Sequence, residues 1–251
     1  MAVILSIETS NQPCSVALTA EGMVLRHREN FDDRNHAALL SGYIKEMLDF
    51  CAEKEIKPEA VAVSMGPGSY TGLRIGLSEA KGLAYGLDIP MIGINTLELM
   101  TTHVMFNYEC DSEDTLFVPM IDARRMEVYT AVYDMSLREV VKPRPVILDG
   151  DDNCLNELLN LSGPVLFFGN GMEKWREYLG DCVAANIRFI DNVVPLAVDM
   201  TALAERAYHR KEFIDTAYST PYYLKDFQAT RPRNKVLGDN AVKTGQEIQK
   251  N

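Results

Sequence analysis

The chain has 251 residues, of which 47% are hydrophobic and 24% are charged, a composition typical of a folded globular protein. Its net charge of −11 argues against binding a nucleic acid alone, because neutralising phosphates requires clustered Lys and Arg. No apolar run reaches the roughly 18 residues of a membrane-spanning helix. Residues 1–7 are apolar without a basic flank, so we expect a buried strand there rather than a signal peptide.

Cysteine usage predicts a reducing, cytoplasmic compartment. The five cysteines are dispersed, with no CxxC pair and no Cys/His cluster. A disulfide framework or a structural zinc site is therefore not expected.

The first half of the chain alternates short β-branched runs with amphipathic segments. The pattern predicts strands at 3–7, 14–18 and 23–30, a helix at 36–53, a strand at 60–65, a helix from 72 to 87, a strand at 91–94 and a helix from 95 to 106. This order indicates an α/β lobe with a three-stranded meander at one edge.

A polar, acidic segment at 107–114 marks the expected domain boundary. Beyond it the pattern predicts strands at 116–121, 128–133 and 140–147, a helix at 152–161, a strand at 165–168, a helix at 171–178, a strand at 187–190 and a helix at 196–209. We therefore expect a first lobe at 1–108 and a second, smaller lobe at 109–228, whose last helix can pack back on the first. The mildly basic segment 229–251 is expected to be a disordered tail.

The most informative stretch is 66–72, a glycine-rich turn between a strand and a helix. Such a turn can bind an anion through backbone N–H groups and the helix dipole, or it can simply be a tight turn. Glu8 and Ser10, at the end of the first strand, could likewise hold a hydrated Mg²⁺ or a phosphate, or cap the following turn. The candidate nucleotide-binding residues are Glu8, Ser10, Gly66, Gly68 and Ser69.

Small side chains form a ridge on the following helix, where Gly72, Gly76, Ala80 and Ala84 recur every four residues. Glycine inside a helix costs about 1 kcal/mol relative to alanine, so the ridge implies a close contact, either internal or with another protein. In the second case the ridge would form one exposed patch with the apolar stripe of the 36–53 helix. The candidate partner interface is Leu39, Leu40, Tyr43, Ile44, Met47, Gly72, Leu73, Gly76, Leu77 and Ala80.

Two adjacent arginines, Arg124 and Arg125, follow Asp122 between two predicted strands. Paired arginines can bind carboxylate or phosphate, although arginines near a turn are more often simply solvated. No Ser-His-Asp or Cys-His set can be assembled from spacing alone.

Three segments together resemble the TsaB (YeaZ) family. They are 4–10 with 14–18, the GPGSYTGLRIG run at 66–76, and DARRMEVY at 122–129; Pro221–Lys225 is also similar to the family's C-terminal signature. The resemblance covers roughly residues 1–228. It implies an actin-like, Hsp70-like ATPase (ASKHA) fold, with two α/β lobes that are each built on a mixed five-stranded sheet.

The resemblance also implies a role in making threonylcarbamoyladenosine in tRNA. In that pathway TsaD transfers the threonylcarbamoyl group, TsaB dimerises with TsaD, and the ATPase TsaE joins them. A homodimer is expected when TsaD is missing. tRNA would be reached only through the complex, and no membrane is involved.

One departure from the enzyme of this pathway bears on catalysis. TsaD-type enzymes carry a pair of metal-binding histidines on the first long helix, whereas this chain has only His36 there. One histidine cannot hold a catalytic metal, so we expect a non-catalytic subunit with no required cofactor, and ATP or ADP at most at the interface of the complex. The alternative is an actin-like nucleotide-binding ATPase that uses Glu8 and the 66–72 turn.

Overall fold

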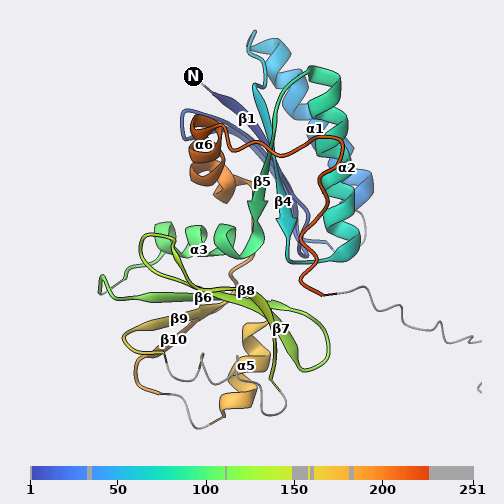
Figure 1. Ribbon diagram of the computed structural model, residues 1–251. Coiled ribbons are helices and arrows are strands. Elements are labelled where there is room, and N and C mark those ends of the chain that lie inside the picture. The colour runs from blue at the N-terminus through green and yellow to red at the C-terminus, as the bar shows by residue number, and fades with distance from the viewer. Residues whose placement is uncertain are drawn as a thin grey trace, which may run out of the picture.

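Two α/β lobes stacked end to end make up the protein (Figure 1). The computed structural model describes residues 2–32, 36–110, 112–148, 158, 161–180 and 184–225, without the side chains of residues 36 and 37. Three predictions therefore lie outside the described part: the helix at 152–161 apart from residues 158 and 161, the tail at 229–251, and any role of the His36 side chain.

The first lobe is built on a sheet with the order β3-β2-β1-β4-β5. Its strands are β1 (Val3–Glu8), β2 (Cys14–Ala20), β3 (Met23–Asn30), β4 (Ala60–Gly66) and β5 (Met91–Asn95). β2 is antiparallel to β1 and β3, whereas β4 is parallel to β1 and β5. β1 lies in the middle of the sheet and is buried along its whole length.

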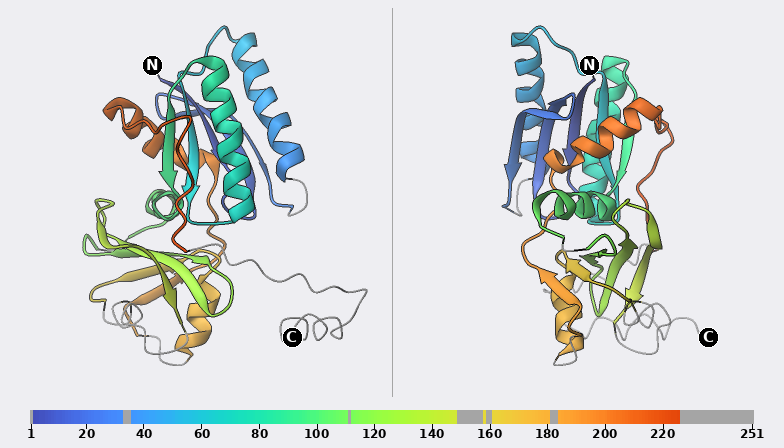
Figure 2. Two further views of the ribbon diagram at one scale, coloured as in Figure 1. Left: turned by 45° about the vertical axis from the view of Figure 1, so that its right-hand side comes forward. Right: turned by 90° about the vertical axis from the view of Figure 1, so that its left-hand side faces the viewer.

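Helices cover both faces of this sheet (Figure 2). α1 (His36–Glu53) and α2 (Tyr70–Leu87) lie side by side on one face, and α6 (Thr201–Arg210) lies on the other. Because successive strand residues point to opposite faces, Leu5 packs in the cluster under α1 and α2, and Ile4 packs in the cluster under α6.

The second lobe repeats the same topology in the order β8-β7-β6-β9-β10. Its strands are β6 (Leu116–Asp122), β7 (Glu127–Tyr133), β8 (Glu139–Ile147), β9 (Val165–Phe168) and β10 (Ile187–Ile190). The first three are antiparallel, and β6, β9 and β10 are parallel, as in the first lobe. α5 (Met172–Leu179) brings Trp175 into the core of this lobe. Two mixed five-stranded sheets with this duplicated order confirm the prediction of an actin-like ATPase fold.

α3 (Thr96–Asn107) joins the two lobes. It follows β5 directly, yet Met100 and Val104 pack with Phe117 and Ile121 of the second sheet in one apolar cluster. Leu99 of the same helix packs with the first sheet, so α3 contributes to the cores of both lobes.

The chain returns to the first lobe after β10. Residues 196–209, predicted as one helix, form a 3₁₀ turn η1 (Ala197–Met200) followed by α6. The residues after α6, 211–225, form an extended strap along α2 (Figure 1). The strap is held by Lys81 Nζ, which donates to the Ala217 carbonyl at 2.9 Å, and by the Tyr222 N–H, which donates to the Met65 carbonyl at 2.6 Å.

The two contiguous stretches 2–107 and 197–225 thus form the first lobe. Lys225, the last residue of the strap, forms an ion pair with Glu127 at the start of β7. This ion pair connects the strap to the second lobe. No helix within the described ranges is long and apolar enough to cross a membrane.

Candidate functional site

The end of β1 places a carboxylate where the two lobes meet. Glu8 is fully buried, and one carboxylate oxygen, Oε1, accepts the N–H of Ser10. Its other oxygen, Oε2, makes no hydrogen bond to any described residue. Burial raises the pKa of Glu8 from 4.5 to about 7, and the charge of Asp199 adds to this, while the nearby Ser10 and Ser64 act in the opposite direction.

The turn 66–72 packs against the loop that follows Glu8. The Ser69 N–H donates to the Ser10 carbonyl at 2.6 Å, and the Gly72 N–H donates to Ser69 Oγ at 3.2 Å. A Cβ on Gly68 would lie 2.3 Å from the Ser10 carbonyl oxygen. The sequence thus uses glycine here because two segments of backbone touch, and two amides that could cradle a phosphate already have partners inside the chain.

Gly66, the remaining candidate in this turn, lies against the backbone of the strap. Its φ of +109° favours glycine, and a Cβ there would lie 3.0 Å from the carbonyl oxygen of Tyr222. The structure therefore brings all five candidate nucleotide-binding residues together, but it joins them mainly to one another and to the strap. Whether a nucleotide binds there stays a prediction.

The lobes also touch through Asn11, which follows β1 and Glu8 in the sequence. Asn170 Nδ2 donates to Asn11 Oδ1 at 2.9 Å, and Asn170 Oδ1 accepts the Asp122 N–H at 2.9 Å. Within the described ranges, no three His, Cys, Asp or Glu side chains are arranged to hold a metal ion.

The small-residue ridge of α2 faces inward, so the expectation that it is exposed is wrong. A Cβ on Gly72 would lie 2.0 Å from the Thr9 carbonyl oxygen, and one on Gly76 would lie 2.2 Å from Thr9 Oγ1. Thr9 Oγ1 also donates to the Gly72 carbonyl at 2.8 Å. The ridge exists because α2 crosses the end of β1 at very close range.

Most of the predicted partner interface is core for the same reason. The buried members are Leu40, Ile44, Met47, Gly72, Leu73, Gly76, Leu77 and Ala80. The stripe of α1 is wide because it spans the strands beneath it. Only Leu39 and Tyr43 are partly exposed, and they alone among the ten could touch another protein without rearrangement.

The outward faces of α1 and α2 carry different small residues, which the sequence reasoning missed. A Cβ on Gly42, Gly82 or Gly86 would meet no atom within 4 Å. Ser41 Oγ donates to Glu79 Oε1 at 2.8 Å and so links the two helices. The signal was present in the sequence, because glycine inside a helix is unfavourable unless something requires it.

An open depression lies along the first half of α2. It has a volume of about 700 Å³ and is lined by Tyr70, Thr71, Arg74, Ile75, Ser78 and Glu79. The three exposed glycines leave open space on the outward face of the paired helices, which another helix can approach closely.

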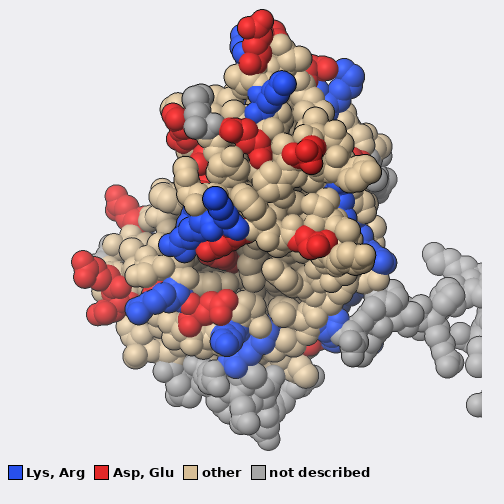
Figure 3. All heavy atoms as spheres, turned by 45° about the horizontal axis from the view of Figure 1, so that its top comes forward, with Lys and Arg blue, Asp and Glu red and all other residues tan. Residues whose placement is uncertain are grey.

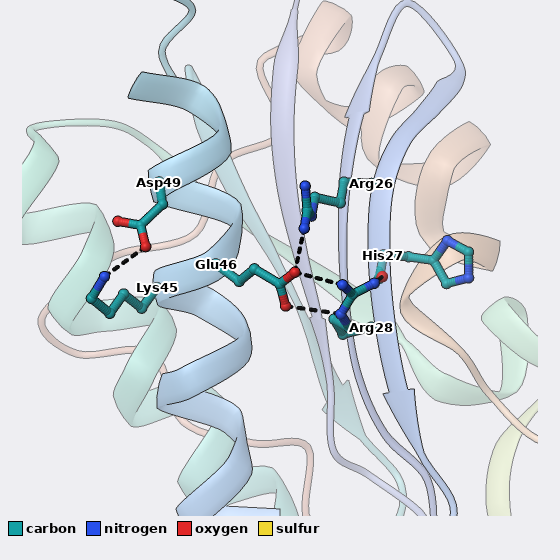
Figure 4. A network of polar contacts seen from close by, with 6 residues as sticks. All are labelled: Arg26, His27, Arg28, Lys45, Glu46 and Asp49. Carbon is teal, nitrogen blue, oxygen red and sulfur yellow. Dashed lines mark hydrogen bonds and ion pairs between the residues drawn. The ribbon is translucent and has the colours of Figure 1, made fainter. Parts of the chain in front are cut away.

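On its other side α1 is clamped to the edge strand β3 (Figure 4). Glu46 accepts from Arg28 Nε at 2.8 Å and forms an ion pair with Arg26. Hydrogen bonding to Arg26, and then to Arg28, holds the pKa of Glu46 below its ordinary value. The side chain of His27 points away from α1 (Figure 4). These contacts fix α1 on the sheet before any partner arrives.

Comparisons with known proteins agree with this architecture. A family model described as TsaD, tRNA N6-adenosine threonylcarbamoyltransferase, matches residues 30–232. The chain is 30% identical over 232 residues to the tRNA threonylcarbamoyladenosine biosynthesis protein TsaB of Escherichia coli, covering 89% of this chain and 94% of that protein. It is 33% identical over 181 residues to TsaB of Bacillus subtilis, covering 71% and 75%.

A solved structure shares the whole fold. A Pseudomonas aeruginosa protein described as similar to peptidase YEAZ superposes with a TM-score of 0.74 at 25% identity. The match covers 90% of this chain and 100% of that one.

Proposed function

Because the chain belongs to the TsaB (YeaZ) family of tRNA threonylcarbamoyladenosine biosynthesis proteins, we propose that it is a non-catalytic partner subunit of the modification complex. In this role it binds and supports the TsaD transferase, together with TsaE, and it acts in the cytoplasm. The chemistry then belongs to the partner.

The outward glycines of α1 and α2 carry this proposal. Gly42, Gly82 and Gly86 face open space, and each costs about 1 kcal/mol of helix stability relative to alanine. A partner helix that packs closely on this face would explain all three, since only a missing side chain lets two helix backbones come together. The same face would pair with a second copy of this chain when TsaD is absent.

The arrangement around Glu8 supports the absence of catalysis. The amides of Ser69 and Gly72 have partners inside the chain, and the residues that the structure describes form no complete set of nucleophile and base near them. ATP or ADP, if bound, would then sit at the interface of the complex.

Co-purification with the cell's own TsaD tests the contact. Gly42→Phe and Gly82→Phe place a ring on the outward face, where the chain itself has room, so we expect both variants to fold and to lose TsaD. Ala202→Phe, on the exposed side of α6 across the sheet, is the matched control and should retain it.

Circular dichroism checks the fold of each variant, and light scattering after gel filtration follows the homodimer. If both glycine variants fold and recover TsaD at wild-type levels, the contact lies elsewhere and the proposal fails.

A further inference from the structure

The turn between β6 and β7 has an unusual backbone. Arg124 and Arg125 have φ values of +66° and +51°, in the left-handed region that residues other than glycine seldom adopt. Such strain persists where the surroundings enforce it, often at functional sites. Asp122 enforces it here, because its Oδ1 accepts the Arg124 N–H at 2.6 Å and Lys174 Nζ at 2.6 Å.

Lys174 completes the support by donating to the Arg125 carbonyl. All of these contacts hold the backbone of the turn from beneath. Both arginine residues are exposed, and neither guanidinium forms an ion pair with a residue that the structure describes.

The strap ends beside this turn. Lys225 forms its ion pair with Glu127, two residues after Arg125. Burial and the charge of Glu127 raise the pKa of Tyr129, while Lys225 and Arg124 oppose the increase. The ion pair of Lys225 with Glu127 places the end of the strap at the start of β7, just after the Arg124–Arg125 turn.

An aromatic pair stands two residues before Lys225 on the strap. The rings of Tyr223 and Tyr70 are 5.1 Å apart at an angle of 30°. The Arg74 guanidinium lies 5.0 Å from the centre of the Tyr70 ring and donates to its hydroxyl at 2.8 Å. Tyr70 is thus held between Arg74 and Tyr223, and Tyr223 remains 44% exposed.

Together Tyr70, Arg74, Tyr223, Arg124 and Arg125 form what we call the Arg–Tyr surface. Acidic and basic side chains are interspersed over the face drawn in Figure 3, and the net charge is −11, so a broad positive field cannot attract a polyanion. An anionic ligand must be recognised by local contacts instead.

Stacking platforms next to cations are how proteins bind single-stranded nucleic acids, since every base has a π-face and every linkage a phosphate. The sequence beyond the strap adds to this, because residues 226–251 contain five Lys or Arg and three Asp or Glu. An acidic peptide could form ion pairs with the arginines, but it would not need the aromatic pair for stacking.

We propose that the Arg–Tyr surface contacts single-stranded RNA, with a base stacked on Tyr223 and the adjoining phosphates paired with Arg124 and Arg125. The inference rests on the tRNA pathway but not on the partner contact. Tyr70 lies on the side of α2 that meets the strap, whereas Glu79 lies on the side that meets α1. The exposed glycines that carry the partner contact, Gly42, Gly82 and Gly86, are not part of the Arg–Tyr surface.

Fluorescence anisotropy with a labelled, unstructured RNA of about 12 nucleotides tests the contact on the full chain at about 50 mM salt. We expect weak binding, with a Kd on the order of 10⁻⁵ M. The double variant Arg124→Glu/Arg125→Glu should weaken it about tenfold or more and reduce the salt slope by about 1.4, because two phosphate contacts are lost. The matched control is Arg210→Glu/Lys211→Glu at the end of α6, which has the same charge change and should retain most of the affinity.

The stacking step has its own pair of variants. Tyr223→Ala should weaken binding about fivefold or more, whereas Tyr223→Phe keeps the ring and should bind as the wild type does. A full-length variant with Arg231→Gln, Arg233→Gln and Lys235→Gln isolates the tail, and on that background the reversal of Arg124 and Arg125 should still lower affinity.

Absence of measurable binding by the wild type would overturn the proposal. Equal loss of RNA affinity in the two double reversals, or full RNA affinity in Tyr223→Ala, would also overturn it. If the Arg124/Arg125 variant binds RNA as the wild type does but loses TsaD, the surface is a protein contact and the proposal is wrong. Failure to bind RNA while TsaD still co-purifies would leave the proposed function intact.

Discussion

Replacing Glu8 with glutamine should stabilise the protein at alkaline pH. Glu8 is fully buried with one oxygen lacking a hydrogen bond, and burial raises its pKa from 4.5 to about 7. Glutamine keeps the oxygen that accepts from Ser10 and carries no charge to bury. Its NH₂ group would replace an oxygen that lies near the hydroxyls of Ser10 and Ser64.

The magnitude follows from the pKa. A carboxyl group whose pKa is raised on folding binds its proton more tightly in the native state, so the free energy of unfolding falls as pH rises from 4.5 to about 7. At roughly 1.36 kcal/mol per pKa unit, the loss is about 3 kcal/mol and is complete above that window. Glu8→Gln should therefore equal the wild type near pH 4.5 and exceed it by up to about 3 kcal/mol at pH 8.

Urea unfolding followed by circular dichroism at several pH values between 5 and 8 measures this difference. The quantity to compare is variant minus wild type, because other groups titrate equally in both. A difference that is constant across the pH range, or one that favours the wild type at pH 8, would refute the reasoning from burial.

Three further results are expected. Gly76→Ala should destabilise the protein by about 1–3 kcal/mol, because its Cβ would lie 2.2 Å from Thr9 Oγ1. Gly82→Ala in the same helix should instead stabilise it by up to about 1 kcal/mol. Denaturant unfolding in which the free energy of unfolding changes in the same direction for both variants would contradict this. Fluorescence of Trp175, the one tryptophan of the sequence, should give the same unfolding midpoint as circular dichroism, because the α3 cluster joins the lobes, and separate midpoints would show that they unfold independently. The purified chain should not hydrolyse ATP, and steady-state turnover on the order of 1 per second that disappears in Glu8→Ala would favour the ATPase alternative.

The strands and helices were largely predictable because their signals are local. Alternation, helical periodicity and turn residues placed β3, α1 and β9 at their observed bounds. The 3₁₀ turn before α6 was not predictable, since its residues continue the apolar pattern of the helix and its geometry depends on contacts such as that of the Ala197 N–H with Ser15 Oγ.

The direction of the α2 ridge could not be read from the sequence. Spacing shows that Gly72 and Gly76 share a face of the helix, but it does not show what lies opposite. Thr9, which requires both glycines, is 63 residues away from Gly72. Gly42, Gly82 and Gly86 were overlooked because they lie outside the series that begins at Gly72, although their exposure makes them as informative as that series.

The division of the first lobe into two stretches of sequence has a consequence for how the protein is made. A ribosome completes β1 to α3, then the whole second lobe, and only then α6. Until α6 emerges, the face of the first sheet that includes Ile4, Ala62 and Ile94 is covered only in part, by Leu99 of α3, whereas the second lobe can finish its own core. Exposed apolar surface of this kind draws chaperones and promotes aggregation. A message cut short between β10 and α6 would therefore yield an aggregation-prone product, even though every strand of both sheets had been translated.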